Sequence, residues 1–314
     1  MTLDDIRRAA DGLRDVAVRT SLHASPPLAE LLGVPVYLKP ENEQPTGAFK
    51  LRGAWTFISR LSSAARRRGV ITYSSGNHGQ AVAYVARRMG LRAVIVMPET
   101  APRTKVAGVR RWNGEVEFAG RTSEDRYARA VAMAEDEGLT VVPPYDHPDI
   151  IAGQGTVGLE IAEDLDDVAC VAVPVGGGGL LAGITTALAA LRPDASIVAV
   201  EPVGSAALAA ALSAGRPVRL DRTASIADGL LPLSVGRVTF DHVRDRVTAV
   251  QVSEEAIGES TVWLNEQGGV RAEPSGAVTT AAVRSGALQP HGPTVLVVSG
   301  GNVDVETINQ LAVA

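Results

Sequence analysis

The sequence is poor in the cysteines that build disulfides and thiolate metal sites, and it has no excess of basic charge. Its single cysteine, Cys170, excludes an internal disulfide and a multi-cysteine metal site. The net charge is -5 over 314 residues and the two signs are interspersed, which argues against nucleic-acid binding. Only three of the 30 basic residues are lysines, so chemistry that needs a free amine has three candidates: Lys39, Lys50 and Lys105.

The five histidines are also sparse and scattered, and none is spaced as a metal ligand relative to another histidine or to the cysteine. We therefore assign no metal site from them. They are His23, His78, His147, His242 and His291.

One uncharged run, 168–191, is long enough to resemble a membrane span. Pro174 and the four glycines Gly176, Gly177, Gly178 and Gly179 divide it into a strand and a helix, which argues against a span. The amino terminus has charges on both sides of its first apolar residues and lacks an export signal. We expect a cytoplasmic protein with no membrane partner.

Short β-rich runs alternate with helical stretches, which predicts an α/β protein. A first series has strands at 70–73, 93–97, 115–118 and 140–142, with helices near 77–90, 103–112 and 123–137. A second series has strands at 168–175, 196–201, 246–252 and 294–299, with helices near 180–191, 205–213, 254–266 and 276–285. Two such series predict two lobes, each built on an open, twisted parallel sheet.

The four glycines at 176–179 follow a predicted strand and open a predicted helix, where backbone N–H groups can bind a phosphate. The same stretch also fits a dinucleotide fingerprint, Gly177-x-Gly179-x-x-Ala182, with Glu201 as the expected ribose ligand. The second interpretation predicts an NAD-dependent dehydrogenase and gives no role to a lysine.

Lys50 follows Phe49 and a Pro-Thr-Gly turn, a placement that would lower the pKa of its amine by desolvation beside an aromatic ring. A second polar loop holds Ser74, Ser75, Asn77 and His78 ahead of a predicted helix. Its amides and hydroxyls could bind a substrate carboxylate, although Ser75 or Asn77 could equally cap the helix.

Four motifs together resemble the fold-type II pyridoxal-phosphate enzymes, a tryptophan synthase beta-like fold, and most closely the serine/threonine dehydratase and serine racemase branch. The resemblance runs from about Arg19 to the end of the chain. The motifs are Thr46-Gly-Ala-Phe-Lys-Leu-Arg-Gly-Ala54, Ser74-Ser-Gly-Asn-His-Gly-Gln80, Gly176-Gly-Gly-Gly-Leu180 and Ser299-Gly-Gly-Asn302.

The resemblance implies that Lys50 forms a Schiff base with pyridoxal 5'-phosphate and that Phe49 lies against its ring. It implies that Asn77 bonds the 3'-oxygen, that Gly176 to Gly179 bind the phosphate and that Ser299 faces the pyridine nitrogen. Ser75 would lie on the cofactor face opposite Lys50, as in the racemases. The resemblance also implies a homodimer, a large domain of residues 1–68 and 147–314, and a small domain of residues 69–146.

A hydroxyl beside a pyridine nitrogen makes the ring a weaker electron sink than a carboxylate does, which favours β-elimination over transamination. We therefore expect a dehydratase that converts L-threonine, L-serine or a related 3-hydroxy amino acid to a 2-keto acid and ammonia. The alternatives are a serine racemase, a 3-hydroxyaspartate dehydratase and, from another class, the dehydrogenase.

The sequence departs from the family pattern at several positions, and these departures limit which functional residues of the family can be assigned to it. Ala48 stands where relatives usually carry serine. The divalent-ion site of the racemase branch would use Glu201 and a carboxylate six positions on, but that position is Ala207, so we expect no such site. Glu273 fits either a position near the pyridine or the start of a helix.

Overall fold

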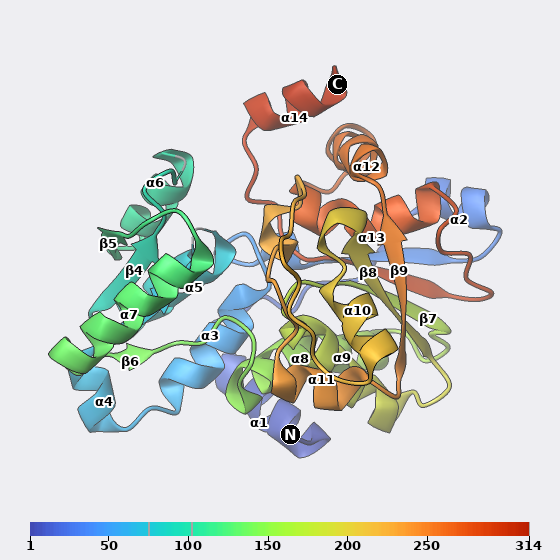
Figure 1. Cartoon of the computed structure of the whole chain (residues 1–314). Coiled ribbons are helices and arrows are strands. Elements are labelled where there is room, and N and C mark those ends of the chain that lie inside the picture. The colour runs from blue at the N-terminus through green and yellow to red at the C-terminus, as the bar shows by residue number, and fades with distance from the viewer. Residues whose placement is uncertain (75, 102, 314) are drawn as a thin grey trace.

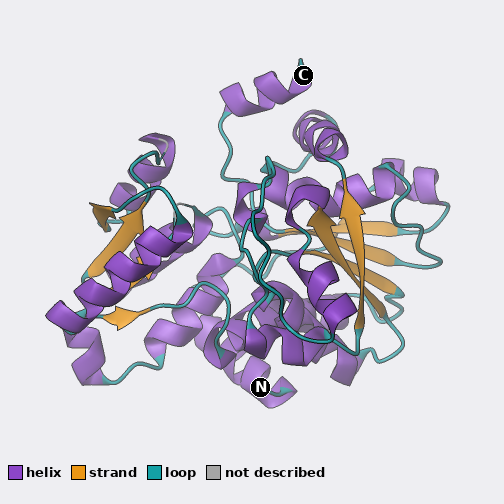
Figure 2. Ribbon diagram, viewed as in Figure 1, coloured by secondary structure: helices purple, strands orange, loops and turns teal. Residues whose placement is uncertain are grey.

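The computed structural model describes residues 1–74, 76–101 and 103–313, apart from the side chain at position 104. Two sheets lie at opposite sides of the molecule, each with helices packed against it (Figures 1 and 2). This arrangement confirms the α/β class and the two parallel sheets predicted from the alternating pattern.

The larger sheet has the strand order β1-β2-β10-β7-β8-β9, and only the pairing of β1 with β2 is antiparallel. Its strands are β1 (His23–Ala24), β2 (Val36–Pro40), β7 (Cys170–Pro174), β8 (Ser196–Pro202), β9 (Val247–Val252) and β10 (Thr294–Val298).

The smaller sheet has the order β5-β4-β3-β6 and is parallel throughout. Its strands are β3 (Val70–Tyr73), β4 (Ala93–Met97), β5 (Glu115–Phe118) and β6 (Thr140–Val141). The first three have the bounds predicted from the sequence, because each is a short β-rich run that ends within two residues of a serine, proline or glycine.

Helices cover both faces of the sheets (Figure 1). Those before β7 are α1 (Leu3–Leu13), α2 (Pro26–Leu32), α3 (Lys50–Ser59), α4 (Ser63–Arg68), α5 (Asn77–Met89), α6 (Arg103–Arg111), α7 (Ser123–Glu137) and α8 (Pro148–Asp164). Those after it are α9 (Gly179–Leu191), α10 (Ala207–Ala214), α11 (Arg237–Val243), α12 (Glu254–Glu266), α13 (Pro274–Arg284) and α14 (Val305–Ala312).

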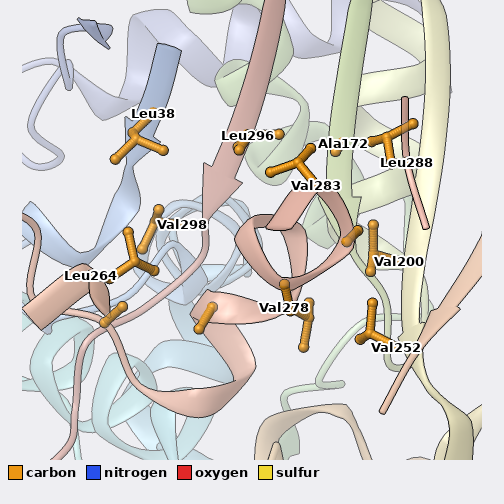
Figure 3. Packing of buried hydrophobic residues seen from close by; sticks show 14 of the residues in the cluster. Leu38, Ala172, Val200, Val252, Leu264, Val278, Val283, Leu288, Leu296 and Val298 are labelled. Atoms are coloured by element: carbon orange, nitrogen blue, oxygen red, sulfur yellow. The ribbon is translucent and has the colours of Figure 1, made fainter. Parts of the chain in front are cut away.

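The central strands of the larger sheet are buried on both faces, which explains their continuous apolar sequences. Along β10, Leu296 and Val298 pack towards α12 and α13, whereas Val295 and Val297 pack towards α8 and α9. Figure 3 shows the first of these layers, where Leu296 lies near Val283 and Val298 lies near Leu264. Cys170 is buried in the same layer, as a small apolar residue.

Helix α8 was not predicted, because it has no polar face. Its residues from Ile150 to Ala162 are all buried, so no helical period appears in the sequence. It packs closely on α9: a β-carbon at Gly155 would lie 3.0 Å from the carbonyl oxygen of Gly183, and one at Gly183 only 2.4 Å from the Gly155 nitrogen. Glycine at both positions allows this close approach.

We propose that the two sheets mark the two domains, with residues 69–146 forming the small domain and residues 1–68 and 147–314 the large one. Sheet membership supports this division, since β3 to β6 lie within the first range and the other strands outside it. Over the described residues, no helix combines the length and apolar composition that a membrane crossing requires.

A buried group of charges holds the first turn of α3 in place. The Arg52 guanidinium donates to both oxygens of Glu41, each at 2.8 Å, and to both oxygens of Glu160, at 2.5 and 2.9 Å. Lys39 donates to Glu160 at 2.6 Å, so two cations balance two carboxylates. The network ties α3 to the end of β2 and to α8.

We predict that Arg52→Ala lowers the free energy of unfolding by about 3–5 kcal/mol, because it leaves two buried carboxylates short of a partner. Urea unfolding followed by circular dichroism would measure it. The control is Arg14→Ala, which removes a solvent-exposed pair with Asp11 and should cost about 1 kcal/mol or less. Equal losses in the two variants would contradict this account.

Candidate active site

The Lys50 motif is attached to the end of β10 by paired backbone. Residues 46–49 lie beside residues 299–302, with the Phe49 N–H donating to the Ser299 carbonyl at 3.1 Å and the Gly301 N–H to the Gly47 carbonyl at 2.9 Å. Gly47 has φ +73°, and a β-carbon there would lie 2.3 Å from the Asn302 side chain, so glycine is required. This pairing brings two of the four motifs together.

Lys50 begins α3 and has a half-buried side chain. Its Nζ donates to the carbonyl oxygen of Pro144 at 2.8 Å and lies 5.1 Å from the centre of the Phe49 ring. Burial lowers the pKa of this amine from its ordinary 10.5 to about 8. The lowered pKa agrees with the desolvation expected from the sequence.

The other two lysines are engaged with carboxylates. Lys39 is fully buried and paired with Glu160, and Lys105 forms an ion pair with Asp228. Lys50, by contrast, has a carbonyl partner and no carboxylate among the described residues. It is therefore the amine best suited to act as a nucleophile and base.

Asn77, the first residue of α5, joins the end of β3 to the larger sheet. Its Nδ2 donates to Oε1 of Glu273 at 2.5 Å, and its Oδ1 accepts from Nδ2 of Asn302 at 2.7 Å. Burial raises the pKa of the Glu273 carboxyl, while the bond from Asn77 lowers it. Glu273 also precedes α13 directly, which confirms that it starts a helix. Its position near the pyridine stays a prediction.

The rest of the loop after β3 is placed as follows. The Ser74 hydroxyl accepts from the Gly76 N–H at 3.3 Å, and His78 is buried with Nε2 3.2 Å from the Val142 carbonyl oxygen. Burial and the nearby Lys50 charge lower the pKa of His78 to about 3. Ser75, predicted to act on the face opposite Lys50, lies outside the described residues.

The glycines Gly176 to Gly179 lie between β7 and α9. Over the described part of the chain, the N–H groups of Gly176, Gly177 and Gly178 donate to no other backbone group, so they remain free for an anion at the helix start. A β-carbon at Gly177 would lie 2.2 Å from the Tyr145 ring. Tyr145 follows Pro144, so one short segment contacts both Lys50 and the glycine loop.

Ser299 directly follows β10 and is buried, with its hydroxyl donating to the Ser275 carbonyl at 3.4 Å. Its backbone contact with Phe49 places it directly beside the Lys50 motif. The free amides at Gly176–Gly178, the amine of Lys50 and this neutral hydroxyl form a donor set that fits a phosphorylated aldehyde with a ring nitrogen.

The dinucleotide interpretation fails because Glu201 is not free to bind a ribose. Its carboxylate is fully buried and accepts from the N–H groups of Leu208 at 2.7 Å and Ala209 at 2.9 Å, at the start of α10. Burial raises the pKa of this carboxyl to about 7. No group of three or more acidic, histidine or cysteine side chains suited to a metal ion occurs within the described ranges.

Comparison with known proteins decides the family. The family model for pyridoxal-phosphate dependent enzymes matches residues 13–300. The chain belongs to this family. Its cofactor is thus pyridoxal 5'-phosphate, as the four motifs predicted.

Three similar proteins, named for three different activities, illustrate the range of reactions within the family. An L-threonine ammonia-lyase of Thermotoga maritima is 42% identical over 99% of this chain and 78% of its own. An L-threo-3-hydroxyaspartate ammonia-lyase of a Pseudomonas species is 39% identical over 96% of this chain and 95% of its own. The structure of maize serine racemase superimposes with a TM-score of 0.94 at 34% identity, covering 99% of this chain and 97% of that one.

The sequence did not assign roles to Pro144, Tyr145 and Asn302. Pro144 acts through its carbonyl oxygen, so no side-chain motif reveals it, and Tyr145 lies in a turn outside the four motifs. Asn302 is inside a recognised motif, but its bond to Asn77 spans 225 positions. Only the folded chain shows that contact.

We predict that Gly177→Ala weakens cofactor binding, because the added methyl would collide with the Tyr145 ring beside the free amides. Overpacking of this kind costs about 1–3 kcal/mol, which corresponds to a roughly 5- to 150-fold rise in the cofactor Kd. Equilibrium titration of cofactor-free protein would measure it. Gly12→Ala, which meets nothing within 4 Å, is the control and should leave the Kd unchanged.

We predict that cofactor capture by the cofactor-free protein accelerates with pH up to about 8 and then levels off. Only the neutral amine attacks an aldehyde, and the Lys50 amine loses its proton near that pH. Stopped-flow absorbance at a series of pH values would show the profile. Acceleration that continued to about 10.5, the ordinary lysine value, would contradict the lowered pKa.

Proposed function

We propose that this protein is an ammonia-lyase that converts L-threonine or L-serine to a 2-keto acid and ammonia. The observation that carries the proposal is the Lys50 amine, which has a lowered pKa and no carboxylate partner among the described residues. Its motif pairs with residues 299–302, and Asn302 of that segment donates to Asn77. The 42% identity to a threonine ammonia-lyase supports threonine as the first candidate.

In this proposal Lys50 takes the α-proton of the bound amino acid and passes it to the departing β-hydroxyl, which leaves as water. The enamine that remains becomes an imine, and water hydrolyses the imine to the 2-keto acid and ammonia. When bound, pyridoxal phosphate withdraws electrons from the α-carbon and so acidifies that proton. The loop at 74–78 binds the substrate carboxylate through its N–H groups and hydroxyls, and the amides of Gly176 to Gly179 hold the phosphate. Phe49 packs against the ring, and Asn77 orients its 3'-oxygen.

Ser299 directs the reaction towards elimination. A neutral hydroxyl stabilises a protonated ring nitrogen less than a carboxylate would, so the ring accepts less negative charge from the α-carbon. Loss of the β-hydroxyl together with the α-proton avoids that charge. The buried acid nearby, Glu273, accepts from Asn77, whereas the Ser299 hydroxyl donates to the Ser275 carbonyl.

Two further parts of the proposal rest on the family alone. We infer a homodimer in the cytoplasm, and we keep 3-hydroxyaspartate as a second substrate because a hydroxyaspartate ammonia-lyase is 39% identical. Racemisation of serine is a possible side reaction on the same residues, in view of the similarity to maize serine racemase.

We predict that L-threonine or L-serine yields a 2-keto acid with the wild-type protein, while Lys50→Ala and Lys50→Arg lose about 100- to 10,000-fold in kcat. Lys50→Arg keeps the positive charge without the reactive amine. Equal losses in the two variants would therefore show that the amine, and not the charge, supplies the activity. A coupled keto-acid assay measures the rates, and unfolding midpoints confirm that both variants fold. L-threo-3-hydroxyaspartate and chiral chromatography of residual serine test the alternatives.

Borohydride trapping and peptide mapping would locate the cofactor-bearing residue. A label on Lys39 or Lys105 in place of Lys50 contradicts the assignment of the site. Turnover of none of the three substrates contradicts the lyase proposal.

A further inference from the structure

The imidazole of His78 has a defined tautomer. His78 lies on the first turn of α5 and is 3% exposed, with Nε2 3.2 Å from the carbonyl oxygen of Val142. A carbonyl oxygen only accepts hydrogen bonds, so Nε2 carries the hydrogen. In the neutral ring Nδ1 then presents a lone pair and can only accept.

This Nδ1 atom is buried and receives no hydrogen bond within the described residues. Buried polar atoms are nearly always paired, so this acceptor calls for a donor that the described residues do not provide. The depressed pKa of about 3 keeps the ring neutral over the physiological range. His78 therefore cannot act as the acid that protonates a leaving hydroxyl.

The position of the ring places this acceptor at the site. His78 and Lys50 bond to carbonyl groups of Val142 and Pro144, which are two residues apart and separated by at most about 7 Å of chain. The charge of Lys50 acts on the His78 ring, which also indicates that the two groups are near each other. The preceding residue, Asn77, bonds to Asn302 and Glu273.

We propose that Nδ1 of His78 accepts a hydrogen bond from an O–H donor in the loaded site, the β-hydroxyl of the substrate or a water molecule beside it. This inference rests on the proposed lyase function, and where the donor is the β-hydroxyl it makes His78 a residue that selects hydroxy amino acids. It assigns the imidazole a task separate from the carboxylate-binding amides of the same loop.

Two amide variants separate the nitrogens of the ring. In His78→Gln the amide nitrogen can reach the Val142 carbonyl, but no acceptor remains at the place of Nδ1. In His78→Asn the amide oxygen stands at the place of Nδ1, but the bond to Val142 is lost. The assay compares kcat/KM for L-serine with that for β-chloro-L-alanine, which eliminates chloride and has no β-hydroxyl.

If the donor is the β-hydroxyl, His78→Gln loses about 3- to 10-fold in kcat/KM for L-serine and nothing for β-chloro-L-alanine, because one neutral hydrogen bond is removed. If the donor is water, kcat/KM of His78→Gln falls equally for both substrates. In both cases kcat/KM of His78→Asn stays close to the wild-type value. Wild-type behaviour of His78→Gln combined with a defect in His78→Asn would overturn the proposal, since the Val142 bond would then be the only role.

A second measurement does not depend on turnover. Nitrogen-15 NMR of the imidazoles in the cofactor-bound protein, with His78 identified by its loss in His78→Gln, should show a neutral ring protonated at Nε2 from about pH 6 to 9. A charged ring or one protonated at Nδ1 would overturn the proposal. Because this spectrum needs no substrate, it tests the tautomer even if the protein turned over none of its proposed substrates, a result that would disprove the lyase function alone.

Discussion

The site depends on how firmly the first turn of α3 is held. On one side, backbone pairing with residues 299–302 fixes Phe49; on the other, the buried Arg52 network fixes the helix two residues after Lys50. A flexible four-carbon side chain needs a firmly held backbone if its amine is to approach a reacting atom with constant geometry. The hydrogen bonds offset the desolvation cost of burying these charges, because every N–H group of Arg52 has an acceptor.

The site is also a junction between the two sheets. Asn77 comes from the end of β3, whereas Glu273 and Asn302 belong to segments next to β10. Ligand sites in open α/β folds form where strands end and helices begin, and here such ends from separate sheets face each other. The bonds of Asn77 to Glu273 and Asn302 are short, and they hold the loop that carries His78 beside the Lys50 motif.

The sequence predicted the strands well and the contacts between motifs poorly. β3, β4 and β5 have the predicted bounds because local composition defines them. β2 and α8 were not predicted: β2 is a short run beside the Lys50 motif, and α8 is buried on all sides. The motifs gave Lys50, Asn77 and the glycine loop as candidates, but the roles of the Pro144 carbonyl and Glu273 depend on partners about a hundred positions or more away in the chain.

The scarcity of lysine has a practical consequence. With Lys39 sealed in the interior and Lys105 held by Asp228, amine-directed reagents such as succinimidyl esters or glutaraldehyde would find few targets beyond the amino terminus and Lys50. Coupling this enzyme to a support through its amines would therefore draw on the amino terminus and on Lys50, the group on which its chemistry depends. Attachment through surface carboxylates would spare it.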